Sequence, residues 1–396
     1  MLVKKMICFM LVCSLVFLTA CWDQVAIEDR GFVVGVAIDM GEEGGEQDKD
    51  NYTLNDTTQI VVPAGFGSPA QGGGGKAFTN ITASGTSMFG ISNEIAEKTS
   101  RIPYYEHLKV LVVSAALAKE SGLFASVMDL FIRDAEMRGS IKIAISSEEA
   151  KSIMEIKPNE EKLSAIYIDS VLENGHKTIE IVDPVTMGDI HGHLLDLSSY
   201  VIPKVKKAGE SKMVSSGVAV FNGYDNKMVG TLNGQETKGL NLVNNTVKGG
   251  LIQFEIDNNL MVFEIEKAKP SVKIDVQDKN NMTISVDIDM KGRIAEMFGS
   301  STLLTPGRFK KIEELVNKKA VQLANHTIKK AQEELHADIF GFGENLNKHH
   351  YDTWQKIKGD WDHGDNLFSK AKINVTVNTI VRTTTETDKT KRKGSE

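Results

Sequence analysis

The sequence predicts a multi-domain α+β protein, with a mixed α/β region in the N-terminal half and an antiparallel sheet packed with a long helix in the C-terminal half. In residues 21–200, apolar β-branched segments alternate with segments of helical period, but without the regularity of repeated βαβ units. In residues 251–382, several β-rich segments precede one apolar stripe of helical spacing. The chain is long enough for two or three domains that each bury a core.

The domain boundaries are predicted from changes in pattern along the chain. The predicted units are a lipoprotein signal peptide (1–20), an N-terminal α/β domain (21–200), a small middle domain (201–250), a C-terminal sheet plus long helix (251–382) and a polar tail (383–396). The boundary near residue 200 depends on a linker-like stretch from Pro203 to Lys212. The tail is predicted to be disordered, because it has too few apolar residues to offset the entropy of ordering.

The first 21 residues have the order of a bacterial lipoprotein signal. Lys4 and Lys5 give a basic start, and Met6 to Leu18 form an apolar run too short to span a bilayer. The residues Leu18-Thr-Ala-Cys21 then resemble a lipobox, in which the peptide is cut before a cysteine that carries diacylglycerol. Two acyl chains give stable anchoring, at roughly 0.8 kcal/mol for each buried methylene. We therefore expect lipidation at Cys21; an ordinary signal peptide with a coincidental cysteine is the alternative.

Charge and cysteine count narrow the functional classes. The formal charge is −7, and it becomes −9 once Lys4 and Lys5 leave with the signal. This balance argues against nucleic acid as a partner and against electrostatic adhesion to anionic lipid, because both need a basic face. Cys8 and Cys13 lie in the signal, so an acylated Cys21 leaves no free thiol in the mature chain. A disulfide framework, a cysteine-based zinc site and a cysteine nucleophile are then excluded.

The N-terminal half alternates predicted strands and helices. Strands are expected at apolar, β-branched runs: Gly31–Asp39, Thr57–Val62, Val110–Val113 and Ile141–Ile145. Helices are expected where apolar residues recur every three or four positions: from Thr86 or Ser87 to Ile95, around Leu123–Phe131, and over Leu163–Leu172. Together these elements predict a mixed sheet covered by helices.

The C-terminal half is predicted to consist mainly of antiparallel strands. Gly217–Phe221 and Met228–Leu232 have the pattern of a hairpin. Four further β-rich segments follow, at Leu251–Ile256, Met261–Ile265, Val272–Val276 and Met282–Ile288. The apolar stripe from Phe309 to Leu335 predicts a helix roughly 45 Å long that covers the apolar face of this sheet. A last strand is expected over Ile373–Val381.

Several short motifs lie in a characteristic order along the mature chain. In the first half they are Cys21-Trp-Asp23, the Gly31–Asp39 strand, Tyr105-Glu-His-Leu-Lys109, and Arg133-Asp134 with Glu136 and Arg138. In the second half they are Gly217–Phe221 with Val229, Gly230 and Leu232, then Asp338-Ile-Phe-Gly-Phe-Gly343 before Trp354. Each motif is short, but their order and spacing resemble the Ger(x)C lipoproteins, the C subunits of nutrient germinant receptors in endospore-forming bacteria. A glycine-rich loop departs from the family pattern, and loops tolerate insertion.

The resemblance implies three α/β domains held by a lipid anchor to the outer face of the spore's inner membrane. It implies two integral membrane partners, the A-type and B-type subunits of the receptor. It also implies a role in the response to nutrients without enzymatic activity. On this basis we expect no catalytic residues, no metal and no cofactor.

Two polar groups are candidates for contact with a partner subunit. They are Tyr105 and His107 in the first motif, and Arg133, Asp134, Glu136 and Arg138 in the second. A structural role is the alternative for both groups. The second group can form an ion-pair network at a helix end, and the first can be a hydrogen-bonded entry into a strand.

The main rival function is a metallophosphoesterase. Asp189 and His191, in Gly188-Asp-Ile-His-Gly192, have the Asp-x-His spacing that places a carboxylate and an imidazole on one metal. Such enzymes need further ligands to hold two ions about 3.5–4 Å apart. The later Asn325-His326 falls inside the predicted long helix, and Gly359-Asp360 falls in a polar loop. We therefore interpret Asp189 as part of a loop or helix start.

Two weaker alternatives come from other motifs, and a second rival function comes from the anchor. His349-His350 with Asp352 could bind a metal, but adjacent histidines point apart in regular structure. The glycine-rich stretch Gly65–Gly75 before Lys76 resembles a phosphate loop, but Ala77 stands where the motif needs a hydroxyl. A solute-binding lipoprotein would share the anchor, but it needs two similar α/β lobes around a cleft.

Overall fold

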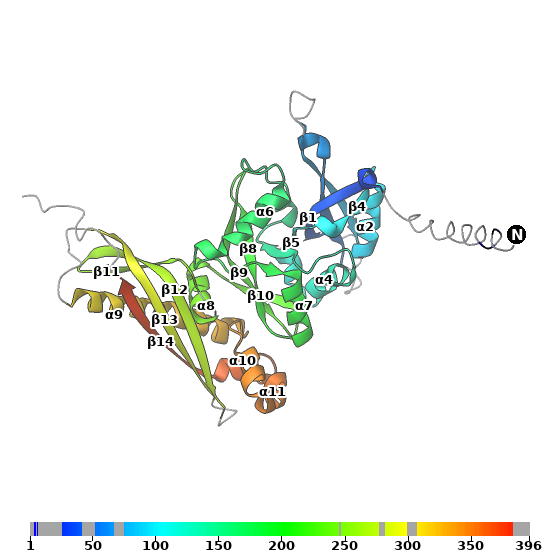
Figure 1. The fold of residues 1–396 in the computed structure, drawn as a ribbon. Helices are drawn as coiled ribbons and strands as arrows, with labels where there is room; N and C mark the ends of the chain where they lie inside the picture. Colours follow the sequence, from blue (N-terminus) through cyan, green and yellow to red (C-terminus); the bar gives the residue numbers. More distant parts are fainter. Residues whose placement is uncertain are drawn as a thin grey trace, which may run out of the picture.

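The computed structural model describes residues 26–41, 52–66, 75–244, 247–276, 282–298 and 307–382, together with Lys4 and Met6. Cys21, the polar tail and most of Gly65–Gly75 lie outside these residues. The described chain forms two sheets with helices around each of them (Figure 1). The predicted α+β multi-domain fold class is confirmed.

The larger sheet has a parallel centre and antiparallel edges. Its ten strands are β1 (Arg30–Met40), β2 (Leu54–Val61), β3 (Phe78–Gly85), β4 (Ile102–Tyr104), β5 (Val110–Ser114), β6 (Lys142–Ser146), β7 (Val185–Thr186), β8 (Tyr200–Lys207), β9 (Met213–Asn222) and β10 (Lys227–Leu232). The order is β10-β9-β8-β6-β5-β1-β2-β3, with β4 beside β1 and β7 beside β6. Strands β1, β5, β6 and β8 are parallel, and β2, β3, β9 and β10 run antiparallel to their neighbours.

Helices cover both faces of this sheet because its central strands are apolar on both sides. On β1, Val36 and Ile38 face one core, whereas Ala37 faces the other. The first core lies under α2 (Met88–Glu97), α3 (Ala115–Ala118), α4 (Leu123–Arg133) and α7 (Met187–Asp196). The second lies under α5 (Ala150–Met154) and α6 (Ser164–Leu172). Helix α2 begins at the predicted position, where the Ser87 hydroxyl accepts a hydrogen bond from the Gly90 amide at 3.2 Å.

The smaller sheet lies in the C-terminal half and carries the long helix. Its strands are β11 (Leu251–Ile256), β12 (Asn259–Asp275), β13 (Thr283–Met297) and β14 (Lys372–Arg382), in that order. Helix α9 (Arg308–Lys330) runs along one face of these strands and continues into a π-helical turn, η7 (Ala331–Leu335) (Figure 1). Its buried stripe includes Ile312, Val316, Ala320, Ala324 and Ile328. The long helix is therefore confirmed over the predicted range.

Three details differ from the sequence-based expectations. Strand β14 pairs parallel to β13, because the chain crosses over through α9 before it returns to the sheet. The segments predicted at Met261–Ile265 and Val272–Val276 are one strand, β12, with two register irregularities at its start. The expected linker from Pro203 to Lys212 is wrong in its first half, since β8 continues to Lys207. Pro203 is tolerated beside a register shift, where a missing N–H costs least.

Residues 201–250 join the two halves. The predicted hairpin is confirmed by the antiparallel pairing of β9 with β10, and both strands extend the larger sheet. Helix α8 (Gly234–Asn244) follows and is buried along most of its length. Gly239 of this helix has no room for any side chain, because a Cβ atom there would lie 2.3 Å from the Leu323 carbonyl oxygen of α9. The domain boundaries at 200 and 250 remain predictions.

Three short helices complete the described chain: α10 (Phe342–His349), α11 (Tyr351–Ile357) and α12 (Leu367–Lys370). They follow one another between η7 and β14, beside the larger sheet (Figure 1). Among the helices of the described residues, none combines the length and apolar character that a membrane span requires.

We predict that Val316→Asp destabilises the protein by several kcal/mol, because it places an unpaired charge at a fully buried position of α9. Lys319→Asp is the matched control, since Lys319 is exposed on the same helix. Denaturant unfolding measures both changes. A Val316→Asp midpoint equal to that of the control would contradict burial of this stripe against the sheet.

Candidate functional site

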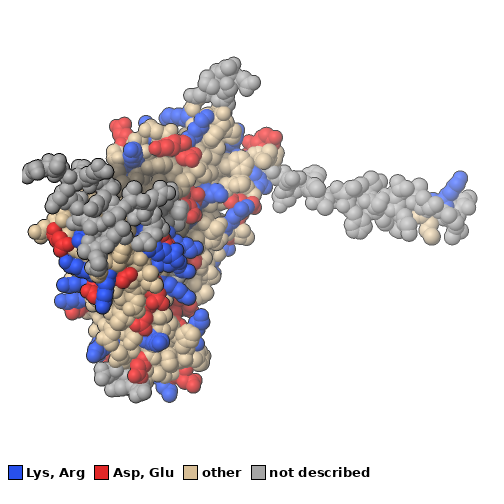
Figure 2. Space-filling view, turned by 60° about the vertical axis from the view of Figure 1, so that its left-hand side comes forward, with Lys and Arg blue, Asp and Glu red and all other residues tan. Residues whose placement is uncertain are grey.

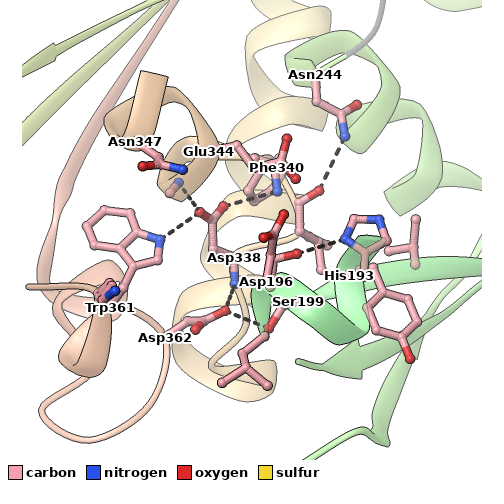
Figure 3. A pocket seen from close by; sticks show the side chains of 18 of the residues that line it. His193, Asp196, Ser199, Asn244, Asp338, Phe340, Glu344, Asn347, Trp361 and Asp362 are labelled. Atoms are coloured by element: carbon pink, nitrogen blue, oxygen red, sulfur yellow. Dashed lines mark hydrogen bonds between the residues drawn. The ribbon is translucent and has the colours of Figure 1, made fainter. Parts of the chain in front are cut away.

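A cavity of about 910 Å³ lies where the larger sheet meets the helices of the C-terminal half. One wall comes from α7 and the start of β8, and the other comes from residues 338–363 (Figure 3). Two buried carboxylates, Asp338 and Asp362, line it together with Trp361. These three residues organise the site.

Asp338 holds the chain in a tight turn after η7. Its carboxylate accepts hydrogen bonds from the amides of Phe340 at 3.1 Å, Phe342 at 3.3 Å and Gly343 at 2.7 Å. Gly341 between them has a φ of 72°, a left-handed conformation that favours glycine. Two of these amides lie in the first turn of α10, so the carboxylate also satisfies donors that the helix cannot pair itself. The Asp-Ile-Phe-Gly-Phe-Gly sequence folds locally around its own first side chain.

The same carboxylate reaches across to Trp361. The Trp361 indole Nε1 donates to the Asp338 Oδ2 atom at 2.7 Å, and both residues are buried. The indole ring also packs edge-on against the Trp354 ring of α11, with 6.2 Å between the ring centres. On another side it packs at a tilt against the Phe368 ring, with 6.1 Å between the centres. Asp338 therefore fixes the position of Trp361 and, with it, the aromatic core beneath α10 and α11.

Asp362 connects this turn to the larger sheet. Its Oδ2 atom accepts from the Ser199 hydroxyl at 2.6 Å and from the Asp338 amide at 3.4 Å. Ser199 directly precedes β8, and its hydroxyl also accepts from the Gly223 amide at 3.2 Å. A chain of hydrogen bonds thus runs from the β9–β10 turn through Ser199 and Asp362 to Asp338 (Figure 3).

Burial raises the pKa of Asp338 to about 6, although its hydrogen bonds from Trp361 and the backbone favour the charged form. Burial also lowers the pKa of His193, which stacks on the Tyr200 ring at 4.9 Å. The Tyr200 ring in turn stacks on Phe221 at 5.0 Å. The aromatic wall of the cavity is therefore built from α7 and the larger sheet.

His193 and Ser198 form the one pair in the cavity that resembles a nucleophile with its base, with 2.8 Å between Nδ1 and the hydroxyl oxygen. The pair closes the end of α7. The Ser198 amide donates to the His193 carbonyl at 3.3 Å, and Leu197 between them is left-handed, as in a helix C-cap. This geometry explains the contact as a helix terminus.

The buried carboxylates of the cavity accept hydrogen bonds from other groups of the protein, and these bonds connect the two halves. We call the hydrogen-bonded set of Asp338, Asp362 and Ser199 the Asp338 joint. The open part of the cavity is lined by further charged side chains, including Asp183, Asp196, Glu344 and Lys358. The described residues contain no group of three or more His, Cys, Asp and Glu side chains placed to hold a metal ion.

Asp189, the carboxylate of the rival metal motif, caps α7. Its Oδ2 atom accepts from the Thr186 amide at 2.9 Å and from the Thr186 hydroxyl at 2.7 Å. The Asp189 amide donates back to the Thr186 hydroxyl at 3.3 Å, which completes a capping box. The interpretation of Asp189 as a helix start is confirmed.

The predicted partner-binding residues lie away from the cavity. Tyr105 and His107 belong to a short 3₁₀ turn, η5 (Tyr105–His107), and their side chains have different neighbours: the Tyr105 hydroxyl lies 3.2 Å from that of Ser92, and the His107 ring packs on Phe32 and Tyr104. Burial raises the pKa of Tyr105 to about 12. Their role in binding a partner remains a prediction.

The alternative of an ion-pair network within the second group is not borne out, because its two arginines pair with carboxylates outside the group. Arg133 contacts Asp129 within α4 at 2.7 Å, and Arg138 reaches Glu106 at 3.8 Å. Asp134 accepts a hydrogen bond from the Glu136 amide at 2.8 Å and closes the turn after α4. The Arg138–Glu106 pair nevertheless joins this turn to η5, so the two predicted groups are neighbours.

Asp338, Trp361, Asp362 and Ser199 were not predicted as site residues. The sequence contains one signal for Asp338, since a carboxylate inside the apolar run Asp338–Gly343 must be buried with partners. Nothing in the sequence pairs Asp362 with Ser199, because 163 residues separate them.

Comparison with known proteins places the chain among spore germination proteins. A model of the spore germination protein N-terminal domain matches residues 23–207, and a model described as spore germination B3/GerAC like, C-terminal, matches residues 216–385. The first match ends with β8 and the second begins within β9, so the boundary between them falls between two neighbouring strands of the larger sheet. The chain belongs to this GerAC-like family, and membership gives it a role in spore germination.

Individual relatives agree over nearly the whole length. Spore germination protein YndF of Bacillus subtilis is 31% identical over 394 residues, which cover 95% of this chain and 94% of that protein. Spore germination protein A3 of the same organism is 28% identical over 96% of this chain and 97% of its own length. The crystal structure of the GerBC protein has the same fold, with a TM-score of 0.60 at 21% identity over 88% of this chain and 96% of that one.

We predict that the buried Asp338 makes stability fall as pH rises. Between about pH 4 and 6 the folded state keeps a proton that the unfolded state has released, because the pKa rises from 3.8 to about 6 on folding. At about 1.4 kcal/mol per pKa unit, the free energy of unfolding should fall by about 3 kcal/mol over this range relative to Asp338→Asn, which cannot titrate.

Denaturant titrations at several pH values measure this difference. Asp365→Asn is the matched control, since Asp365 is an exposed aspartate of the same segment. The parent and the control should show the same pH dependence. If Asp338→Asn also follows them, Asp338 has an ordinary pKa and the proposed cost of its burial is wrong.

Proposed function

We propose that this protein is a lipid-anchored, non-catalytic subunit of a nutrient germinant receptor. It works at the outer face of the spore's inner membrane, in a complex with A-type and B-type integral membrane subunits. The observation that carries the proposal is the family match over both halves of the chain, directly after a lipobox-like sequence that ends in Cys21. The proposed anchor at Cys21 and the folded part that follows it, which we call the head, belong to one polypeptide, and no helix of the described residues can span a membrane.

The physical role of the anchor is to concentrate the head beside its partners. Two acyl chains confine the protein to a surface, which raises its effective concentration near other membrane proteins. Modest interfaces then hold a complex that would dissociate in solution. The formal charge of −9 for the mature chain supports anchoring by acyl chains over anchoring by charge.

The arrangement of polar groups supports a role without catalysis. The Asp338 and Asp362 carboxylates accept hydrogen bonds from other groups of the protein. The Asp189 carboxylate caps the start of α7, and the His193–Ser198 contact closes the end of the same helix. Each of these groups therefore has a structural explanation. The two halves differ in topology, which does not favour the paired lobes of a solute-binding lipoprotein.

We expect spores that lack this gene to lose germination with the cognate nutrient and to keep germination with a trigger that bypasses receptors. The reason is that the complex cannot form without one of its subunits. Loss of optical density of spore suspensions measures both responses. Normal nutrient germination, in a strain without a redundant receptor, would contradict the proposal.

We expect Cys21→Ala to abolish lipidation and to release the protein from the membrane fraction. Cys13→Ala is the matched control, because Cys13 lies within the predicted signal and is removed with it. Mass spectrometry and membrane fractionation measure the two effects. A Cys21→Ala protein that stays as firmly membrane-bound as the control would show that another feature holds it there.

A further inference from the structure

The first strand of the described chain forms an unusual edge of the molecule. The first three residues of β1 extend beyond β2 and pair instead with the short strand β4, in the register Arg30–Ile102, Gly31–Pro103 and Phe32–Tyr104. This two-stranded part lies at the outer end of the N-terminal half, far from β11–β14 (Figure 1). It is also the point at which the described chain begins.

One face of this ribbon is apolar, aromatic and partly open. Because side chains alternate along a strand and paired residues share a face, Arg30, Phe32, Ile102 and Tyr104 lie on the same side. We call this the β1–β4 face. The Arg30 guanidinium sits 4.0 Å from the centre of the Tyr104 ring, and the Phe32 and Tyr104 rings meet edge-on at 6.1 Å. The His107 ring completes the cluster, at 5.3 Å from Phe32.

Two isoleucines at this edge are exposed to a degree unusual for their type. Ile102 is 57% exposed, and Ile27, three residues before β1, is 65% exposed. Isolated exposed apolar side chains need no explanation, but here Ile102 shares a face with the side chains of Arg30, Phe32 and Tyr104, and Ile27 shortly precedes the same strand. Tyrosine and arginine carry an apolar body with a polar tip, which suits a surface that is apolar on one side and wet on the other.

The length of chain before β1 places this face close to the anchor. Four residues separate Cys21 from Ala26, so five residue-to-residue steps of no more than about 3.6 Å each reach about 18 Å. A lipid at Cys21 therefore keeps Ala26, next to Ile27, within about 18 Å of the acylated cysteine. This reach is about three times the depth of one headgroup layer, because the two headgroup regions together add roughly 10–15 Å to the hydrocarbon core. The opposite end of the molecule has no such constraint.

We infer that the β1–β4 face, with Ile27, contacts the lipid headgroup layer and orients the head on the membrane. This inference rests on the anchor at Cys21 that the proposed function includes. The contact is short-ranged and apolar, because the mature chain is acidic and charges of both signs are interspersed over its surface in the view of Figure 2. The anchor supplies the affinity, and the face supplies the orientation.

A site-specific fluorophore tests this contact. The acylated protein has no other thiol, so Ile102→Cys creates a single site for a polarity-sensitive label such as nitrobenzoxadiazole. Ile380→Cys is the matched control, because Ile380 is an isoleucine of similar exposure, 65%, on β14 of the distant sheet. The lipidated proteins are inserted into vesicles of phosphatidylethanolamine and phosphatidylglycerol that carry a nitroxide on the headgroup.

We expect the label at position 102 to be quenched severalfold more strongly than the label at position 380. Equal quenching at the two positions, or no quenching at 102 in protein that floats with the vesicles, would overturn the inference and leave the anchor intact. Lipidated protein that fails to float would overturn both. A label at 102 that becomes shielded from aqueous iodide only after the membrane subunits are added would show that a protein covers this face, and would overturn the contact with lipid.

Discussion

The close approach of α8 to α9 is the constraint on which the two halves depend. Gly239 lies so near the α9 backbone that no side chain fits, and the Thr327 hydroxyl donates to the Glu236 carbonyl at 2.8 Å beside it. The buried Glu236 side chain pairs with Lys330 of α9 at 2.8 Å, and the ammonium group lowers its pKa against the effect of burial. Helix α8 also leads directly out of β10. The larger sheet and the long helix are therefore held by one element with little freedom to move.

The second tie between the halves is the hydrogen-bonded chain from Asp338 through Asp362 to Ser199. It differs from the helix contact because the buried Asp338 carboxylate accepts from uncharged donors, whereas the buried Glu236 carboxylate is paired with the Lys330 ammonium group. Burying a carboxylate is costly unless donors satisfy it, and Asp338 has four of them. Such a site is specific in geometry but sensitive to protonation. The strength of this joint therefore responds to pH.

The elements predicted correctly are those whose signal is local. The stripe through Ile312 and Val316 repeats at helical spacing, and a helix is the structure that buries it. The parallel pairing of β14 was not predictable, because alternation along a strand says nothing about the direction of its neighbour. Pro203 was taken as a linker signal, although a bulge lets a strand accommodate it. The joint was missed because 163 residues separate Ser199 from Asp362 in the sequence.

Because the two halves are rigidly connected, the orientation of the end that carries the proposed anchor determines the orientation of the whole protein. If α8 and the Asp338 joint hold the two sheets in one arrangement, the orientation of β1 on the membrane sets the position of every other surface. The turn after α4, which Arg138 ties to η5, then lies near the bilayer, whereas β11–β14 lie far from it (Figure 1). In the proposed orientation, the predicted partner residues Tyr105, His107 and Arg138 would lie on the membrane side of the protein, and the cavity and the C-terminal sheet would lie farther from the bilayer.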